Sequence, residues 1–118
     1  MVDKIKIIVV DDRSSIVDSI AQYLDFHGFK TIKAVGSEIA LELIKKEKPD
    51  LMLVDVKMPK MNGFELCDKL SNQKVLFMTG YDEFDEKAKK YKNSIGVIRK
   101  PIDLPKLMNI IKKEFNIS

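Results

Sequence analysis

Cysteine, histidine and tryptophan are almost missing from this chain of 118 residues, which has one cysteine, one histidine and no tryptophan. A single cysteine cannot form an internal disulfide, so we expect a reduced, cytoplasmic protein. That cysteine, Cys67, stands among Phe64, Leu66 and Leu70 and is expected to be a small core residue rather than a reactive thiol. His27 closes a predicted helix, where a cation is favoured, and is expected to lie on the surface.

Long apolar runs and a strong net charge are also missing. No apolar run approaches the length that spans a bilayer, and Asp3, Lys4 and Lys6 interrupt the N-terminus before a signal peptide could form. The 21 lysine and arginine residues against 18 aspartate and glutamate residues leave a net charge of only +3. That excess is too small to indicate a nucleic-acid-binding surface. We therefore expect neither membrane insertion nor direct binding of nucleic acid.

The chain does contain a regular alternation of apolar strands and amphipathic helices. Its composition, 45% hydrophobic and 33% charged, is typical of one globular domain covering residues 1–118. Strands are predicted at residues 5–10, 30–35, 51–54, 74–79 and 95–99. Helices are predicted at residues 16–27, 37–48, 63–70, 83–92 and 104–115, with Ser37 as a helix cap. This alternation predicts an α/β fold in which helices cover both faces of a parallel sheet.

Chemically distinctive side chains close four of the five predicted strands. Asp11 and Asp12 follow the first strand, Asp55 the third and Lys100 the fifth, while Thr79 ends the fourth. Taken singly, Asp11 or Asp12 could cap a helix, and Thr79 and Lys100 could be ordinary residues at a strand end or in a loop. If these four strands are neighbours, all five side chains converge on the edge where ligands bind in such sheets. We favour the joint site, because the separate explanations would have to hold at successive strand ends.

Three carboxylates at one edge repel one another and therefore predict a bound cation. Oxygen ligands without histidine or cysteine favour a hard ion, Mg²⁺, with Mn²⁺ as the alternative. Lys100 and Thr79 are suited to phosphoryl oxygens, because one offers positive charge and the other a hydrogen-bond donor. Asp55 stands alone at its strand end and is the predicted nucleophile toward phosphorus, whereas the pair Asp11 and Asp12 suits the metal.

At these positions the chain resembles the receiver domain of two-component response regulators. The shared motifs are Asp11-Asp12, Asp55, Met58-Pro59-x-Met61-Asn62-Gly63, Thr79-Gly80 and Lys100-Pro101, and the resemblance extends over essentially the whole chain. It implies a doubly wound, flavodoxin-like sheet of five parallel strands in the order 2-1-3-4-5, with five helices. It also implies a cis peptide between Lys100 and Pro101.

The same resemblance implies a signalling switch. A sensor histidine kinase or a histidine phosphotransfer protein would donate the phosphoryl group of its phosphohistidine to Asp55 with Mg²⁺ bound. Asp12, Asp55 and the backbone carbonyl of Lys57 would ligate the metal, and Asp11 would act directly or through water. Thr79 and Lys100 would bind the phosphoryl oxygens. Such a domain is not an enzyme with a separate substrate: it catalyses its own phosphorylation and slow autodephosphorylation.

Two positions and the length of one stretch depart from the family pattern. Val97 stands three residues before Lys100, where the family usually has an aromatic residue that turns inward upon activation. Asn62 stands where aspartate is common, and the stretch from Asp55 to Thr79 is short, which predicts a trimmed third helix. With Val97 at the switch position, the usual aromatic readout of phosphorylation is not available.

Two further sets of residues are expected to act around the site. Lys57 and Tyr81 are bulky and flank the path of attacking water, so we expect them to slow hydrolysis of the acyl phosphate, as in the stand-alone phosphorelay regulators that the chain resembles. The partner is expected to dock on the start of the first helix and on the loop after the fifth strand, at Arg13, Ser14, Ser15, Ile16, Pro101 and Ile102.

Two other functions stay open. The chain could be a receiver-like adaptor whose docking does not depend on phosphate. It could also be an aspartate phosphatase, although Lys57 stands where such enzymes have a second aspartate. Phe115, at the end of the last predicted helix, is three residues from the end of the sequence. If this is the whole protein, the output is expected to be a downstream protein partner. We expect a monomer, with phosphorylation-dependent dimerisation as the alternative.

Overall fold

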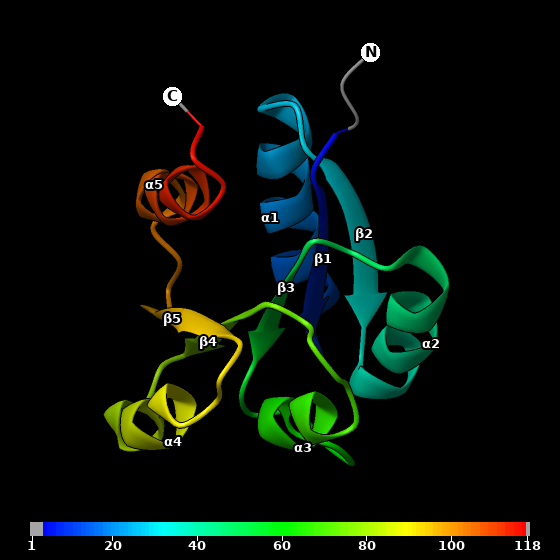
Figure 1. The fold of residues 1–118 in the computed structure, drawn as a ribbon, viewed down its shortest axis with the longest axis vertical. Helices are drawn as coiled ribbons and strands as arrows, with labels where there is room; N and C mark the ends of the chain where they lie inside the picture. Colours follow the sequence, from blue (N-terminus) through cyan, green and yellow to red (C-terminus); the bar gives the residue numbers. More distant parts are fainter. Residues whose placement is uncertain (1–3, 118) are drawn as a thin grey trace.

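The chain folds into five parallel strands connected by helices, as the alternation predicts (Figure 1). A computed structural model describes residues 4–117. The strands run in the order β2-β1-β3-β4-β5, which confirms the predicted order. In chain order the elements are β1 (Lys6–Asp11), α1 (Ser14–Phe26), β2 (Lys30–Val35), α2 (Ser37–Glu47), β3 (Leu51–Asp55), α3 (Gly63–Asp68), β4 (Val75–Thr79), the short 3₁₀ helix η1 (Asp82–Phe84), α4 (Asp85–Lys89), β5 (Ser94–Arg99) and α5 (Leu104–Glu114).

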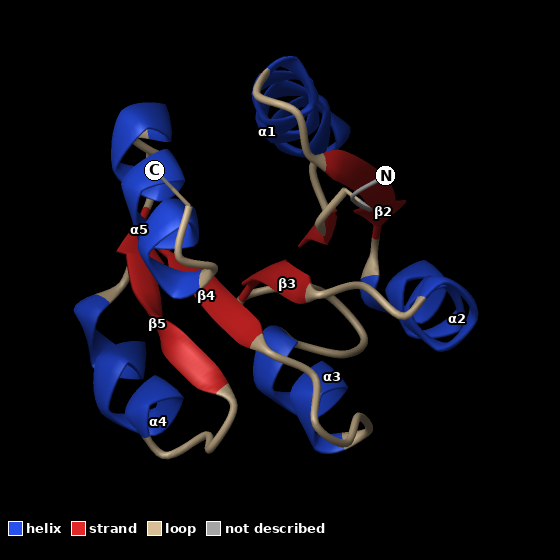
Figure 2. Ribbon diagram, turned by 45° about the horizontal axis from the view of Figure 1, so that its top comes forward, coloured by secondary structure: helices blue, strands red, loops and turns tan. Residues whose placement is uncertain are grey.

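Helices cover both faces of the sheet (Figure 2). Alternate side chains of each strand therefore face opposite helical layers. Ile7 and Val9 of β1 pack with α1 and α5, whereas Ile8 and Val10 pack with α2, α3 and α4. All four of these side chains are fully buried. The central strands β1, β3 and β4 are therefore held rigidly between two apolar layers, and the residues at their carboxyl ends have fixed positions.

The turn between β3 and α3 is held by two local devices. Asn62 forms a capping box, in which its side chain accepts from the Glu65 amide and the Glu65 side chain accepts from the Asn62 amide. A Cβ atom placed on Gly63 would lie only 2.6 Å from the backbone oxygen of Asp55, so only glycine lets the helix start this close to the strand end. Helix α3 has six residues, which confirms the predicted short third helix.

Two local predictions were wrong. Ser37 does not cap α2: Gly36 occupies the cap position and Ser37 is the first helical residue. The helix predicted at 83–92 is instead η1 followed by α4, which ends at Lys89. Tyr91 leaves the helix to stack on the Phe64 ring and to donate a hydrogen bond to Asp68, so tertiary contacts override the helical pattern there.

The remaining surface predictions fit the described part of the chain. Cys67 packs against the core, and burial raises the pKa of its thiol to about 12, which disfavours the reactive thiolate. His27 follows α1 as an exposed residue. Within residues 4–117, none of the helices is both long and apolar enough to cross a membrane.

Candidate functional site

Three aspartates meet at the carboxyl edge of the sheet, as the strand ends predict. Asp11 ends β1, Asp55 ends the neighbouring strand β3, and Asp12 follows Asp11 directly. One carboxylate oxygen from each of the three lies within 4.8 Å of the others. Arg13, not Asp11 or Asp12, occupies the cap position of α1, so helix capping does not explain the two acidic residues.

Lys100 supplies positive charge to this acidic cluster. Its Nζ atom lies 2.7 Å from Asp11 Oδ2 and 3.2 Å from Asp55 Oδ2. The other oxygen of Asp11 accepts a hydrogen bond from the Arg13 amide at 3.0 Å, so both oxygens of this fully buried carboxylate are engaged. Asp12, by contrast, is exposed. One ammonium group thus contacts two of the three carboxylates, whose summed charge exceeds its own.

Asp55 is the carboxylate most perturbed by this arrangement. Burial and the nearby charge of Asp11 raise its pKa from 3.8 to about 6, against the opposing effect of Lys100. Only 6% of the residue is exposed. A raised pKa together with access to an open hollow is typical of a reactive carboxylate.

Thr79, at the end of β4, and the Lys100-Pro101 peptide, after β5, lie at the same carboxyl edge of the sheet as the aspartates. Thr79 is buried, and its Oγ1 accepts a hydrogen bond from the Tyr81 amide at 3.1 Å. The Lys100 amide donates to the Thr79 carbonyl at 3.0 Å, and the Lys100-Pro101 peptide is cis, as the family resemblance implies. The structure therefore brings Thr79 and Lys100 together with the aspartates at the ends of adjacent strands.

The two predicted hydrolysis-tuning residues also meet at the site. Lys57 and Tyr81 line a hollow of about 380 Å³ together with Asp12, Arg13, Asp55, Gly80 and Lys100. The Lys57 ammonium lies 4.6 Å from the centre of the Tyr81 ring, a cation–π contact between the loops that follow β3 and β4. The contact places two bulky side chains beside Asp55.

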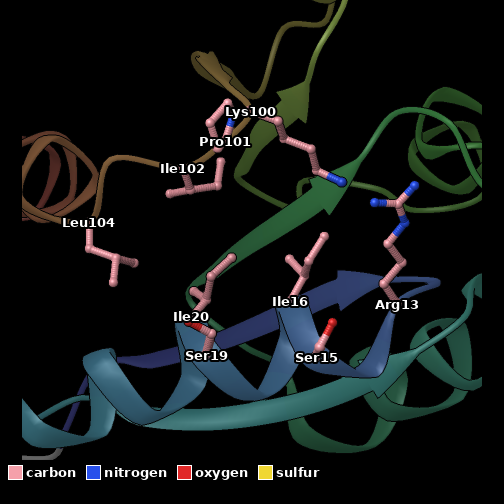
Figure 3. Close-up of a pocket in the computed structure, with 9 residues that line it drawn as sticks. All are labelled: Arg13, Ser15, Ile16, Ser19, Ile20, Lys100, Pro101, Ile102 and Leu104. Carbon is pink, nitrogen blue, oxygen red and sulfur yellow. The ribbon is translucent and has the colours of Figure 1, made fainter.

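Five of the six predicted docking residues line an apolar groove (Figure 3). Arg13, Ser15 and Ile16 line it from the start of α1, and Pro101 and Ile102 line it from the loop after β5. Ser14 is not among its lining residues, whereas Ser19, Ile20, Leu104 and Lys100 are. The prediction missed three residues of α1 and α5. Ser19 and Ile20 lie one helical turn beyond Ser15 and Ile16, and Leu104 lies at the first turn of α5, so helical spacing could have found them.

The sequence also gave no reason to include Arg99, the last residue of β5. Its guanidinium donates to the Tyr81 carbonyl at 3.0 Å and to Asp85 Oδ2 at 2.8 Å, and it lies 3.1 Å from Asp82 Oδ1. Pairing with these carboxylates raises the pKa of Arg99. Val97, two residues earlier, packs on the same face of the strand, against the layer that includes Phe84 and Tyr91.

The donor set fits a magnesium ion. Asp11, Asp12 and Asp55 supply only oxygen atoms, and their summed charge exceeds that of Lys100. Hard divalent cations take such ligands and keep open positions for water or phosphate. Lys57, whose backbone carbonyl is the further predicted ligand, lines the same hollow.

Comparison with known proteins agrees with this geometry. The model of the response regulator receiver domain family matches residues 7–112. Sporulation initiation phosphotransferase F of Bacillus subtilis is 32% identical over 113 residues, which cover 92% of this chain and 91% of that protein. The transcriptional regulatory protein PhoP of the same species is 43% identical over 86 residues, 69% of this chain but only 36% of that protein.

Solved structures give the same answer. A CheY-like response regulator receiver domain protein from Methanospirillum hungatei superposes with a TM-score of 0.87 at 29% identity, covering 97% of this chain and 95% of that one. Matched over most of its length by the family model, with acidic residues, threonine and lysine at the ends of neighbouring strands, this chain belongs to the family of response regulator receiver domains.

Proposed function

We propose that this domain is a phosphoacceptor switch in which Asp55 takes a phosphoryl group from a phosphohistidine on a sensor histidine kinase or a histidine phosphotransfer protein. The observation that supports it most is the position of Asp55, which lines an open hollow together with Lys100 and Asp12. Its pKa is also raised, by burial and by the charge of Asp11. A carboxylate oxygen of Asp55 attacks phosphorus, the phosphorus–nitrogen bond breaks, and its electron pair stays on the imidazole.

The residues around Asp55 have separate tasks in that step. Asp11, Asp12, Asp55 and the Lys57 carbonyl would hold Mg²⁺, which when bound offsets the negative charge of the carboxylates and the phosphoryl oxygens. Lys100 is placed to contact a phosphoryl oxygen, because its ammonium already lies 3.2 Å from Asp55. Thr79 can turn its hydroxyl toward the same group if it gives up the hydrogen bond from Tyr81.

The partner would dock in the groove of α1 and the β5–α5 loop. Ile16, Ile20 and Ile102 form an apolar floor there, and Arg13 and Lys100 line both this groove and the hollow over Asp55. A helical partner that covers the groove could therefore present its phosphohistidine to Asp55. The likeness to sporulation initiation phosphotransferase F over nearly its full length supports a role in phosphate transfer. We propose that this chain passes the group between proteins in the cytoplasm and does not turn over a separate substrate.

The proposal is tested by incubating the chain with acetyl phosphate and Mg²⁺ and measuring intact mass. We expect one added phosphoryl group on the wild-type chain and none on Asp55→Ala. Omitting Mg²⁺, or adding a chelator, should suppress the adduct, and Mn²⁺ should restore it. No adduct, or one that survives Asp55→Ala, would favour a docking module that works without phosphate.

A further inference from the structure

In the loop between β4 and α4, the backbone of Tyr81 forms hydrogen bonds with two side chains. The Tyr81 amide donates to the Thr79 hydroxyl at 3.1 Å, and the Tyr81 carbonyl accepts from the Arg99 guanidinium at 3.0 Å. Thr79 ends β4 at the carboxyl edge of the sheet, where the aspartates also lie, whereas Arg99 ends β5. The backbone of Tyr81 is thus hydrogen-bonded both to the hydroxyl at the end of β4 and to a side chain of the neighbouring strand β5.

Arg99 also fixes the residues that follow Tyr81. Its guanidinium donates to Asp85 Oδ2, at the first turn of α4, at 2.8 Å and pairs with Asp82 in η1 at 3.1 Å. The Asp85 side chain is one-third exposed, whereas that of Asp82 is almost fully exposed, so we assign the larger effect to Asp85. The planar guanidinium reaches these acceptors from two separate nitrogen atoms, whereas an ammonium group would have to reach them from one.

The position of Arg99 matters because of Val97. Both residues lie on the face of β5 that packs toward α4, and Val97 is the position where the resemblance to the family places an inward-turning aromatic. Val97 has no hydrogen-bonding side chain, so it cannot form the polar contacts that hold the loop. Arg99 is the next side chain along that face, one step nearer the acidic site.

We propose that Arg99 is the readout residue of this receiver: its contacts with Tyr81, Asp82 and Asp85 hold the β4–α4 loop and α4 in the position described above, and phosphorylation releases them. This rests on the proposed phosphorylation of Asp55. When the Thr79 hydroxyl turns toward a phosphoryl oxygen, the Tyr81 amide loses its acceptor, and the peptide that Arg99 also holds is free to move. By linkage, a variant without these Arg99 contacts binds a phosphoryl mimic more tightly, because less free energy is spent on releasing the loop.

The test uses beryllofluoride with Mg²⁺ as the mimic of the phosphoryl group, on the whole chain. Arg99→Gln is compared with Lys89→Gln, which removes the same charge from the end of α4 and breaks only the exposed pair with Glu86. We expect Arg99→Gln and Asp85→Asn each to bind beryllofluoride about two- to fivefold more tightly than the wild type, and Lys89→Gln to bind as the wild type does. Arg99→Lys should fall between, because it keeps the charge but not the three-way contact.

A second readout follows the loop itself. In the free Arg99→Gln protein, backbone amide signals of residues 80–89 should already lie part of the way toward their beryllofluoride-bound positions, with faster hydrogen exchange than in Lys89→Gln. If the wild type binds beryllofluoride and Arg99→Gln matches it in affinity and in these amide signals, the role of Arg99 is overturned while the phosphoacceptor function stands. If the wild type binds no beryllofluoride, both proposals fail together.

Discussion

Lys100 is closer to Asp11 than to Asp55, with its Nζ atom 2.7 Å from the first carboxylate and 3.2 Å from the second. The shorter contact goes to the carboxylate that is completely buried and cannot be solvated by water. Asp55 has the longer contact, so Lys100 can approach an oxygen of a group attached to Asp55 while Asp11 keeps its partner. The geometry therefore separates the structural task of Lys100 from its proposed role in binding phosphate.

Removing the Lys100 ammonium should destabilise the fold. Lys100→Met leaves Asp11 and Asp55 buried without a cation, and we expect a loss of about 3 kcal/mol in the free energy of unfolding when no metal is bound. Urea unfolding in the presence of a chelator, near neutral pH, measures it. The control is Lys33→Met, which breaks an exposed pair with Asp18 and should cost at most about 0.5 kcal/mol. Equal effects of the two changes would contradict this account.

Removing the charge of Asp55 should stabilise the metal-free protein. The pKa of Asp55 is raised from 3.8 to about 6, so between these values the folded state binds the proton more tightly than the unfolded state does. That contribution to stability is complete below about pH 4 and is lost as pH rises through about 6, which leaves the ionised group unfavourable at neutral pH. We expect Asp55→Asn to be about 1–2 kcal/mol more stable than the wild type there.

The pH dependence separates this explanation from a general effect of the substitution. The advantage of Asp55→Asn should shrink as pH is lowered from neutral toward 4, because the wild-type carboxyl then becomes neutral as well. Thermal unfolding of both proteins with a chelator, across that range, measures the difference. The exposed Asp18 provides the comparison, and Asp18→Asn should show no such pH-dependent gain. A gain for Asp55→Asn that does not vary with pH would exclude the raised pKa as its cause.

The sequence predicted those parts of the molecule that depend on strand ends. Asp11, Asp55, Thr79 and Lys100 each adjoin an apolar strand, and parallel strands bring their carboxyl ends to one edge whatever the loops do. The contacts of Arg99 could not be predicted in this way, because they depend on how the loop at Tyr81 folds back toward β5. The early end of α4 was missed for a similar reason, since Tyr91 follows its contacts with α3 rather than the helical pattern.

Substitution of Gly63 should be far more damaging than that of Gly80. A Cβ atom on Gly63 would lie 2.6 Å from the Asp55 backbone oxygen, so Gly63→Ala must shift either the start of α3 or the end of β3. We expect a loss of about 2 kcal/mol in the free energy of unfolding together with slower phosphorylation by acetyl phosphate. A Cβ atom on Gly80 meets no atom within 4 Å, so Gly80→Ala is the matched control for the free energy of unfolding. Similar losses for both variants would show that Asp55 is not the affected contact.

The groove beside the site should matter only for a protein donor. Ile16→Ala and Ile102→Ala remove apolar lining from the groove and leave the acidic cluster intact. We expect each to lower kcat/KM for transfer from a phosphorylated histidine phosphotransfer domain about tenfold, and to leave phosphorylation by acetyl phosphate unchanged. Ile39→Ala, at an exposed position of α2 outside the groove, is the control. Equal losses with both donors would place the defect in the reaction rather than in docking.

The contact between Lys57 and Tyr81 should lengthen the lifetime of the phosphorylated protein. The Lys57 ammonium lies 4.6 Å from the centre of the Tyr81 ring, and both side chains line the hollow over Asp55, where water must enter to attack phosphorus. Lys57→Ala keeps the backbone carbonyl that is the predicted metal ligand, so its effect reports the side chain. We expect Lys57→Ala and Tyr81→Ala each to shorten the half-life about two- to fivefold, the range of one exposed cation–π contact.

Intact mass, followed over time after removal of excess acetyl phosphate, measures that half-life. Lys87→Ala is the matched control, because its ammonium makes a similar contact with the Phe64 ring, at 4.8 Å, and lines no part of the hollow over Asp55. If the two side chains act as one shield, the double variant should lose little more than either single variant, since each substitution alone already opens the path for water. Independent effects that multiply would instead mean that Lys57 and Tyr81 obstruct separate approaches, and an unchanged half-life in all three variants would show that neither side chain limits access.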